Sequence, residues 1–236
     1  MEIRVAKTAG FCFGVNRAVE LTYGLLAEGH RVATLGPLIH NPQAVEDMQR
    51  KGAQVVDTVQ DVPAGYEVVI RSHGVPRSVY DELTARGIRY HDATCPFVQK
   101  IQRIAAEAEK AGAVLLVAGD KTHPEVQGIV GHTRGEVFVF ADLAELKAWK
   151  GPSDPQKPLF AVAQTTFQVT KWQESSEFLK KAYTNARIFD TICNATWARQ
   201  QEAEDLSQKC DIIVVIGGHH SSNTQKLVQV AAKHTR

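Results

Sequence analysis

Short apolar, β-branched runs alternate with longer amphipathic stretches along almost the whole chain. The apolar runs predict strands over residues 3–6, 32–35, 68–70, 114–118, 137–140, 159–163 and 212–216. The amphipathic stretches predict helices over residues 14–28, 43–51, 77–86, 96–111, 168–182 and 195–209. Alternating strands and helices are typical of parallel sheets with helices on their faces, so we expect an α/β fold.

Five of the expected strands end in a small polar segment, in most cases one that contains Gly or Pro, after which a helix begins. These segments are 36–42, 72–74, 119–125, 164–166 and 217–223. In open α/β sheets, ligands bind beyond the carboxyl ends of the strands, where helix N-termini offer free N–H groups. One such segment alone is better explained as a turn with a helix cap. Five together indicate one shared polar cavity.

Composition and charge narrow the class of protein. The chain has 236 residues, about one and a half domains of ordinary size. Its 27 basic and 26 acidic residues give a net charge of +1, so we expect no nucleic-acid partner. No apolar run approaches the roughly 20 residues that span a bilayer, and the first residues do not resemble a signal peptide. We therefore expect a cytoplasmic protein with no membrane partner.

Four cysteines are too few for a disulfide scaffold in a chain of this length. Cys12, Cys95 and Cys193 each stand immediately before an expected helix, where the helix dipole favours a thiolate. Cys210 instead stands at the entry of an expected strand, and we interpret it as a small buried hydrophobic residue.

The three helix-entry cysteines are too far apart in sequence for a paired C-x-x-C motif. The separations are 83 residues from Cys12 to Cys95 and 98 from Cys95 to Cys193. Converged by the fold, three thiolates fit either a zinc site with an open position or a cubane cluster with one iron lacking a protein ligand. An open iron is a Lewis acid that can bind a substrate oxygen.

Eight short motifs occur in order along the chain. They are Gly10-Phe11-Cys12-x-Gly14-Val15, Ile39-His40-Asn41, Ser72-His73-Gly74-Val75, Asp92-Ala93-Thr94-Cys95-Pro96, His123-Pro124-Glu125-Val126-x-Gly128, Gln164-Thr165-Thr166, Cys193-x-Ala195-Thr196 and Ser221-Ser222-Asn223. This ordered set resembles the LytB family of 4-hydroxy-3-methylbut-2-enyl diphosphate reductases, and it covers most of the chain.

The resemblance implies three small Rossmann-like α/β lobes in a pseudo-threefold arrangement around a central iron–sulfur cluster. The lobes would comprise residues 14–96, 97–192 and 193–236 plus 1–13. Relatives of this family continue through further elements with another diphosphate-binding serine, so we expect the third lobe to be incomplete at the C-terminus. The cluster would be a [4Fe–4S] cubane with three cysteine ligands, Cys12, Cys95 and Cys193, and one open iron.

The resemblance also implies the substrate and the residues that act on it. The substrate would be an allylic diphosphate, reduced by two electrons and two protons with electrons from ferredoxin or flavodoxin. The implied diphosphate-binding residues are His40, His73, Ser221, Ser222 and Asn223, a set without Lys or Arg. His123 would lie beside the substrate, Glu125 would deliver the proton, and Thr165 would assist it.

General chemistry agrees with these roles. An allylic hydroxyl is a poor leaving group, so its loss needs a Lewis acid on oxygen and a nearby proton donor, here Glu125. Two alternatives remain open at this point. One is a metal-dependent phosphatase or isomerase that uses some of the histidines His40, His73, His123, His219 and His220. The other is a non-catalytic iron–sulfur or diphosphate-binding module.

Overall fold

The computed structural model describes residues 2–235 and contains two four-stranded parallel sheets. The first has the order β2-β1-β3-β4, and the second has the order β6-β5-β7-β8. The first sheet comprises β1 (Val32–Leu35), β2 (Gln54–Val56), β3 (Glu67–Ile70) and β4 (Tyr90–Asp92). The second comprises β5 (Val114–Ala118), β6 (Val137–Phe140), β7 (Leu159–Ala163) and β8 (Ala186–Ile188). The parallel α/β class predicted from the alternating pattern is confirmed.

Helices cover both faces of each sheet. In the first sheet, α1 (Phe13–Ala27) and α2 (Pro42–Arg50) share one apolar core, and α3 (Arg77–Ala85) packs on the opposite face. In the second sheet, α4 (Pro96–Lys110) and α5 (Pro124–Val130) cover one face, and α6 (Leu143–Ala148) and α7 (Val169–Ala182) cover the other. A 3-10 turn, η1, spans Val59–Asp61. The central strands β5 and β7 are buried along their full length, as expected for strands covered on both faces.

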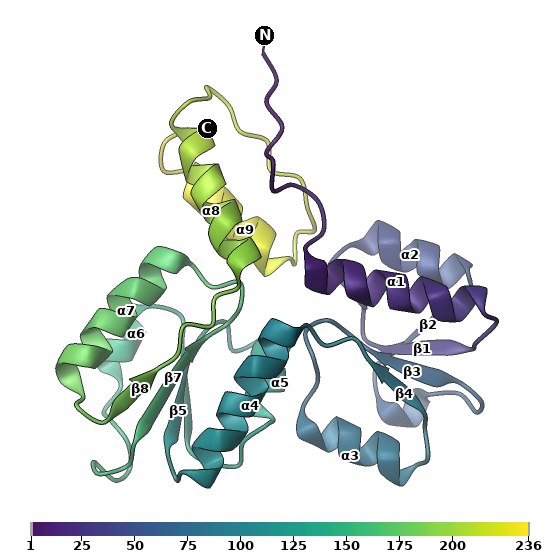
Figure 1. Cartoon of the computed structure of the whole chain (residues 1–236), viewed down its shortest axis with the longest axis horizontal. Coiled ribbons are helices and arrows are strands. Elements are labelled where there is room, and N and C mark those ends of the chain that lie inside the picture. Colours follow the sequence, from purple (N-terminus) through teal and green to yellow (C-terminus); the bar gives the residue numbers. More distant parts are fainter. Residues whose placement is uncertain (1, 236) are drawn as a thin grey trace.

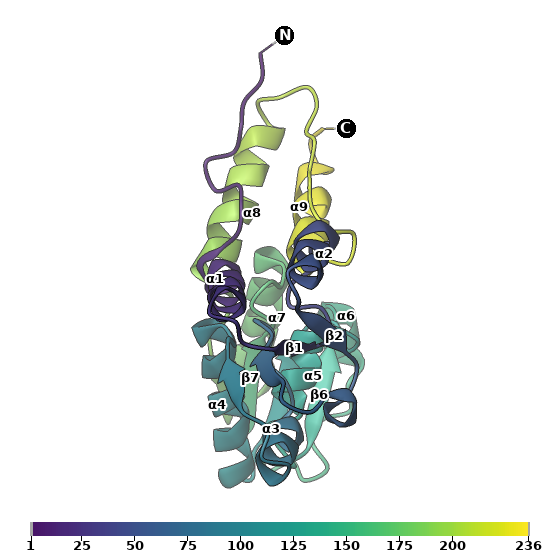
Figure 2. The same ribbon diagram turned by 90° about the vertical axis from the view of Figure 1, so that its right-hand side faces the viewer.

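The C-terminal part consists of two helices packed against each other, α8 (Asn194–Ser207) and α9 (Ser222–Ala231). Viewed from the side, α1, α4 and α8 lie on one side of the molecule, and α2, α5 and α9 lie on the other (Figure 2). The N-termini of these helices converge at the centre, between the two sheets and the C-terminal helices (Figure 1). This convergence positions the candidate site.

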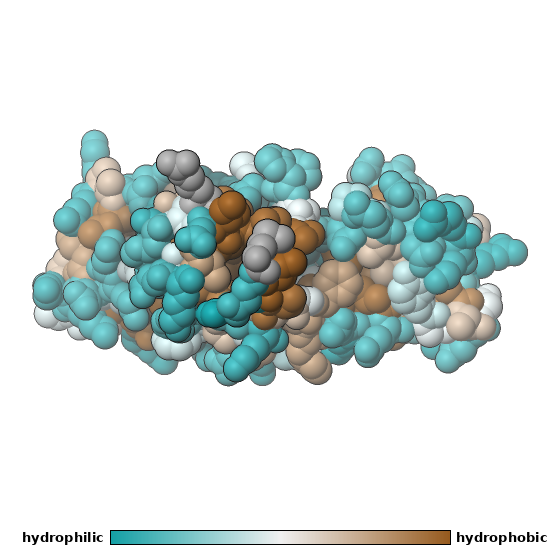
Figure 3. All heavy atoms as spheres, turned by 90° about the horizontal axis from the view of Figure 1, so that it is seen from above, coloured by the Kyte–Doolittle hydropathy of each residue, from teal (hydrophilic) through white to brown (hydrophobic). Residues whose placement is uncertain are grey.

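Two strand predictions are wrong. Residues 3–6 and 212–216 are extended in part but pair with no strand within the described range 2–235. Their apolar residues Ile3, Val5, Ile212, Val214 and Ile216 are 70–92% exposed. An apolar patch is visible at the end of the molecule that carries both termini (Figure 3). The apolar pattern indicates strand propensity, but a strand also needs a neighbour whose hydrogen bonds complete the ladder.

Cys210 is partly buried rather than buried, which corrects its interpretation as a core residue. The reason is that the strand expected to follow it does not form, so no sheet covers the thiol. Across residues 2–235, none of the helices combines the length and apolar character needed to span a bilayer.

Candidate active site

One cavity of about 340 Å³ collects every residue that the resemblance nominated for the reductase reaction, whereas His219 and His220, named for the metal-dependent alternative, are not among its lining residues. Its walls include the three helix-entry cysteines, the three predicted histidines, the acidic residue with its threonine, and the polar C-terminal segment. These are Cys12, Cys95, Cys193, His40, His73, His123, Glu125, Thr165, Ser221, Ser222 and Asn223. The expectation of one shared cavity is thus confirmed for residues of all five segments, although the segment 217–223 follows no strand within residues 2–235.

Six helices begin at this cavity, and their N-cap residues form part of its wall. Cysteines cap α1, α4 and α8, whereas Asn41 caps α2, His123 caps α5 and Ser221 caps α9. The six helices form three pairs, α1 with α2, α4 with α5 and α8 with α9. In each pair a cysteine caps one helix at the cavity and another polar residue caps the other. Because the N-terminus of a helix carries partial positive charge and free N–H groups, six of them favour anionic ligands.

The three cysteine thiols that line the cavity do not form a compact group. Tetrahedral zinc with bonds of about 2.3 Å to sulfur holds its thiolates within about 4 Å of each other. Among residues 2–235, the only ligand group whose atoms all lie within 4.8 Å of one another is the histidine set, and the cysteines form no such group. The three thiols are thus too widely spaced, as the structure places them, to hold a single zinc ion together.

Cys95 depends on two features of its surroundings. Gly14 in α1 faces it, and a Cβ atom at that position would lie 2.6 Å from the Cys95 Sγ. Burial raises the pKa of the Cys95 thiol, although N–H groups of α4 act in the opposite direction. A buried thiol of raised pKa becomes a thiolate when a metal binds it, since the metal supplies the missing positive charge.

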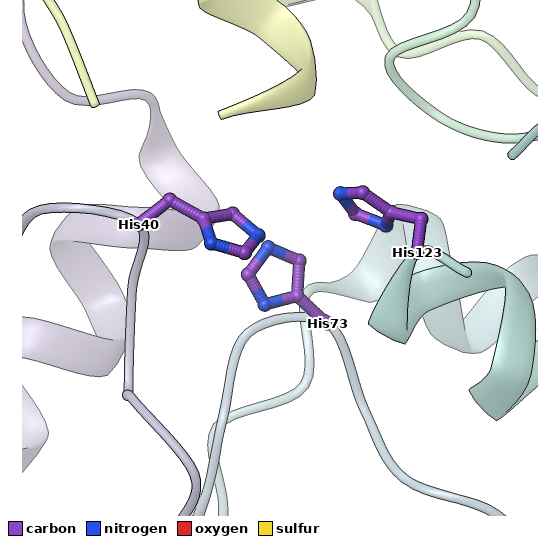
Figure 4. A group of neighbouring side chains, drawn as sticks. All are labelled: His40, His73 and His123. Atoms are coloured by element: carbon purple, nitrogen blue, oxygen red, sulfur yellow. The ribbon is translucent and has the colours of Figure 1, made fainter. Parts of the chain in front are cut away.

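Three imidazole rings meet in the wall of the same cavity, as Figure 4 shows. The ring centroids of His40 and His73 are 4.5 Å apart, and each lies 5.4 Å from the ring of His123. Nε2 of His40 and Nδ1 of His73 are buried and have no hydrogen-bond partner. Unpaired buried nitrogens indicate a ligand that would complete their hydrogen bonds.

Burial keeps these imidazoles neutral. It lowers the pKa of His40, lowers that of His73 well below the usual 6.5, and brings that of His123 to about 4. Nδ1 of His123 accepts a hydrogen bond from the Glu125 N–H at 3.1 Å, so its proton lies on Nε2. Figure 4 shows this second nitrogen directed toward the other two rings. His123 therefore presents a donor, which suits an anion better than a metal cation.

A cation behind the histidines was missed by the sequence reasoning, which expected no Lys or Arg at the anion site. Arg71 is partly buried, and its charge lowers the pKa of all three histidines. None of the carboxylates within residues 2–235 lies within 4.0 Å of it, and its guanidinium makes one long hydrogen bond in that range, 3.5 Å from Nε to the Gly74 carbonyl. The signal was its position directly after β3, beside Ser72 and His73. This uncompensated charge favours an anion in the cavity.

Glu125 is the only acidic side chain in the cavity wall, within the range described, and it is 2% exposed. Thr165 contacts both of its oxygens, through the backbone N–H to Oε1 at 2.6 Å and through the hydroxyl to Oε2 at 2.7 Å. Burial raises the pKa of Glu125 to about 7, and the hydrogen bonds from Thr165 limit the rise. A carboxyl group with this pKa can donate a proton near neutral pH.

Two further polar residues, Gln164 and Thr166, connect the second sheet to the C-terminal part. The Thr166 hydroxyl donates to Ser222 Oγ at 3.0 Å, and Gln164 Nε2 lies 3.5 Å from the same oxygen. Sequence reasoning placed both in a polar segment but gave neither a role. On the other side, Gly218 packs directly against the His40 carbonyl, where a side chain would not fit. These contacts hold the segment 221–223 over the histidines.

Comparison with known proteins gives a consistent result. The LytB protein family matches residues 3–236. The 4-hydroxy-3-methylbut-2-enyl diphosphate reductase of Caldanaerobacter subterraneus subsp. tengcongensis is 41% identical over 244 residues, covering 100% of this chain and 82% of that protein. The enzyme of the same name from Syntrophotalea carbinolica is 42% identical over 231 residues, covering 98% of this chain and 81% of that protein.

Two solved structures are similar to this one. The E-1-hydroxy-2-methyl-but-2-enyl-4-diphosphate reductase of Plasmodium falciparum superposes with a TM-score of 0.88 at 26% identity, covering 95% of this chain and 71% of that one. An (E)-4-hydroxy-3-methyl-but-2-enyl diphosphate reductase, described as the terminal enzyme of the non-mevalonate pathway, gives a TM-score of 0.73 at 34% identity. This match covers 99% of this chain and 83% of that one.

Proposed function

The chain belongs to the LytB protein family, and from that premise we propose how its cavity converts (E)-4-hydroxy-3-methylbut-2-enyl diphosphate into isopentenyl and dimethylallyl diphosphates. The reaction is the last step of the methylerythritol phosphate route to isoprenoids. It consumes two electrons and two protons and releases the allylic hydroxyl as water. The observation that carries the proposal is one cavity lined by three cysteines, a cluster of anion-binding donors and a buried carboxyl group.

LytB enzymes are iron–sulfur proteins, and we propose that Cys12, Cys95 and Cys193 hold a [4Fe–4S] cluster with one iron open. Two features of the chain support this: the thiols are too widely spaced for one zinc ion, and Gly14 leaves space for the Cys95 thiol. When bound, such a cluster supplies a Lewis acid for the substrate oxygen and relays single electrons.

The diphosphate binds, in this proposal, among His40, His73 and the segment 221–223. The unpaired nitrogens of the two histidines provide hydrogen bonds, and the N-termini of α2, α5 and α9 add positive potential. Arg71 contributes charge from behind the histidines without entering the cavity. These groups would orient the allylic end of the substrate toward the cysteine side.

Glu125 is the proton source in this proposal, with Thr165 as the connecting group. When Glu125 is protonated, its Oε2–H can donate to the Thr165 hydroxyl, which in turn can donate to a substrate atom in the cavity. His123, whose Nε2–H is directed into the same space, would help to position the substrate. Burial excludes competing water from the carboxyl group.

Three sequence expectations stay predictions. Ferredoxin or flavodoxin is the proposed electron donor, and the cytoplasm is the proposed location. The proposed lobe bounds are 14–96, 97–192 and 193–236 plus 1–13; apart from the first residue of α1 and of α4, they place α1 and α2 in the first lobe, α4 and α5 in the second, and α8 and α9 in the third. The relatives favour the reductase over a metal-dependent phosphatase, an isomerase or a non-catalytic module.

The proposal is tested on anaerobically purified protein. We expect a broad absorbance near 400 nm, typical of iron–sulfur proteins, and turnover of the hydroxylated allylic diphosphate with a reduced viologen dye. A protein without that absorbance after reconstitution with iron and sulfide would contradict the cluster assignment. A protein with the cluster but without turnover would instead support the non-catalytic module.

A further inference from the structure

An exposed aromatic side chain lies close after each of the three cysteines. Phe13 in α1 is 66% exposed, Phe97 in α4 is 39% exposed and Trp197 in α8 is 51% exposed. None of the three lines the cavity, so they do not serve to bind the substrate. Large aromatic side chains left exposed within the first four residues of three helices are typical of an interaction surface.

The same helix ends carry a positive charge. The first seven residues of α1, α4 and α8 contain one cation each and no Asp or Glu. These cations are Arg17, Lys100 and Arg199, and they donate to the backbone carbonyls of Thr94, Asp190 and Thr8, among others. Since carbonyls do not neutralise them, and no carboxylate in residues 2–235 pairs with them, the charges remain available. The dipoles of the three helix N-termini have the same sign.

The helices that carry these residues share one side of the molecule. The N-termini of α1, α4 and α8 converge in Figure 1, and Figure 2 shows the three helices together on the side away from α2, α5 and α9. The cysteines that cap these helices line the cavity. A protein docked here would be close to the thiols without blocking the anion-binding residues.

We propose that this aromatic face, formed by Phe13, Arg17, Phe97, Lys100 and Trp197, docks an acidic one-electron carrier protein of the ferredoxin or flavodoxin type. The inference rests on the proposed function, because the reaction needs two electrons. Two carriers would dock in turn, each losing one electron, while two protons are consumed and water is released. Aromatic side chains supply most of the binding energy in many interfaces, and complementary charge speeds the encounter.

The test uses the cluster-loaded enzyme and two acidic probes, a bacterial flavodoxin and a [2Fe–2S] ferredoxin. Binding is measured by calorimetry at low and at high salt, and turnover is measured with each carrier and with reduced viologen. The test variants are Phe97→Ala, Trp197→Ala and Lys100→Glu. Matched controls lie outside this face: Val228→Ala on α9 and Lys180→Glu in the last turn of α7, both exposed positions.

We expect each test variant to weaken carrier binding about tenfold and to raise the carrier KM by a similar factor. Viologen-driven turnover should stay within twofold of wild type, since a small dye needs no docking surface. Unchanged carrier binding in all three variants, or equal losses in the controls, would overturn the proposal. Absent viologen-driven turnover in the wild type would contradict the proposed function instead, while the calorimetric result would still decide the docking surface.

Discussion

Thr165 donates to both oxygens of the Glu125 carboxyl group, with its backbone N–H 2.6 Å from Oε1 and its hydroxyl 2.7 Å from Oε2. The backbone contact fixes the carboxyl group in either protonation state. The hydroxyl contact can reverse direction, because a hydroxyl is both a donor and an acceptor. The pair can therefore hold a proton and pass it into the cavity.

Replacement of Glu125 by Gln should separate proton delivery from binding. Gln keeps an acceptor for the Thr165 N–H and has nearly the same shape, so the cluster and the substrate affinity should stay close to wild type. Turnover should fall by roughly 10²–10⁴, as for loss of a general acid. Anaerobic turnover with reduced viologen measures the effect, and Glu177→Gln, at an exposed position of α7, is the control. Near-normal turnover would place the proton source elsewhere.

The pH dependence of turnover should follow the protonation of Glu125. Its pKa of about 7 means that the donor form dominates below pH 7 and is lost as the pH rises. With proton delivery limiting, turnover should fall about tenfold per pH unit above the pKa.

Thr165→Val tests whether Glu125 causes this fall in turnover at high pH. The Thr165 hydroxyl stabilises the Glu125 carboxylate, so its removal should raise the pKa of Glu125. The fall in turnover should then begin at higher pH, and the maximal rate should be lower. Thr165→Ser keeps the hydroxyl and should restore the wild-type profile. A wild-type turnover that stays constant from pH 7 to 9 would contradict the assignment of Glu125 as the proton donor. So would a fall in turnover that begins at the same pH in Thr165→Val as in the wild type.

Arg71 should act on the anion through its charge. We expect Arg71→Met to weaken the binding of inorganic diphosphate about tenfold, the order of one charge acting across several ångströms of protein. The pKa values of His40, His73 and His123 should rise, since that charge lowers them now. Calorimetry and NMR titration of the imidazoles measure the two effects. Arg71→Lys keeps the charge and is the control; equal losses in both variants would indicate a packing role.

The sequence predicted the site better than the sheets. Cys12, Cys95 and Cys193 precede helices, and His40 and His73 follow strands, so a parallel α/β arrangement places all of them at one edge. That deduction needs only the direction of the chain at each residue. The role of Arg71 could not be deduced in this way, because Arg71 does not line the cavity and its distance from the histidines depends on side-chain packing.

The strands were predicted less well, because a strand forms only where a neighbouring strand can pair with it. β2, β4 and β8 have three residues each and partly exposed positions, so they carry little apolar signal. Residues 212–216 carry a strong signal but pair with nothing within residues 2–235. An apolar run indicates that a segment can be buried. Whether it forms a strand depends on a neighbouring strand, which is determined by the rest of the fold.

The three cavity cysteines should each be required for the cluster. Cys12→Ser, Cys95→Ser and Cys193→Ser should lose most of the bound iron and the absorbance near 400 nm. Cys210→Ser should retain both, because Cys210 does not line the cavity. Iron and sulfide per chain after anaerobic reconstitution give the readout. A cluster lost only with Cys210 would overturn the ligand assignment.

Gly14 should prove as important to the cluster as a ligand, because of the space that it leaves. A Cβ atom at Gly14 would lie 2.6 Å from Sγ and 2.9 Å from Cβ of Cys95, so Gly14→Ala should displace the thiol and reduce cluster occupancy several-fold. Gly24 is the matched control: it lies in the same helix, and an added Cβ there meets no atom within 4 Å.

Gly24→Ala should keep the cluster and raise the free energy of unfolding by about 0.5–1 kcal/mol, since Ala favours a helix. Iron content and thermal unfolding distinguish the two variants. Full cluster occupancy in Gly14→Ala would show that α1 or α4 can shift to accommodate the methyl group. The claim that the cluster requires glycine at this position would then be wrong.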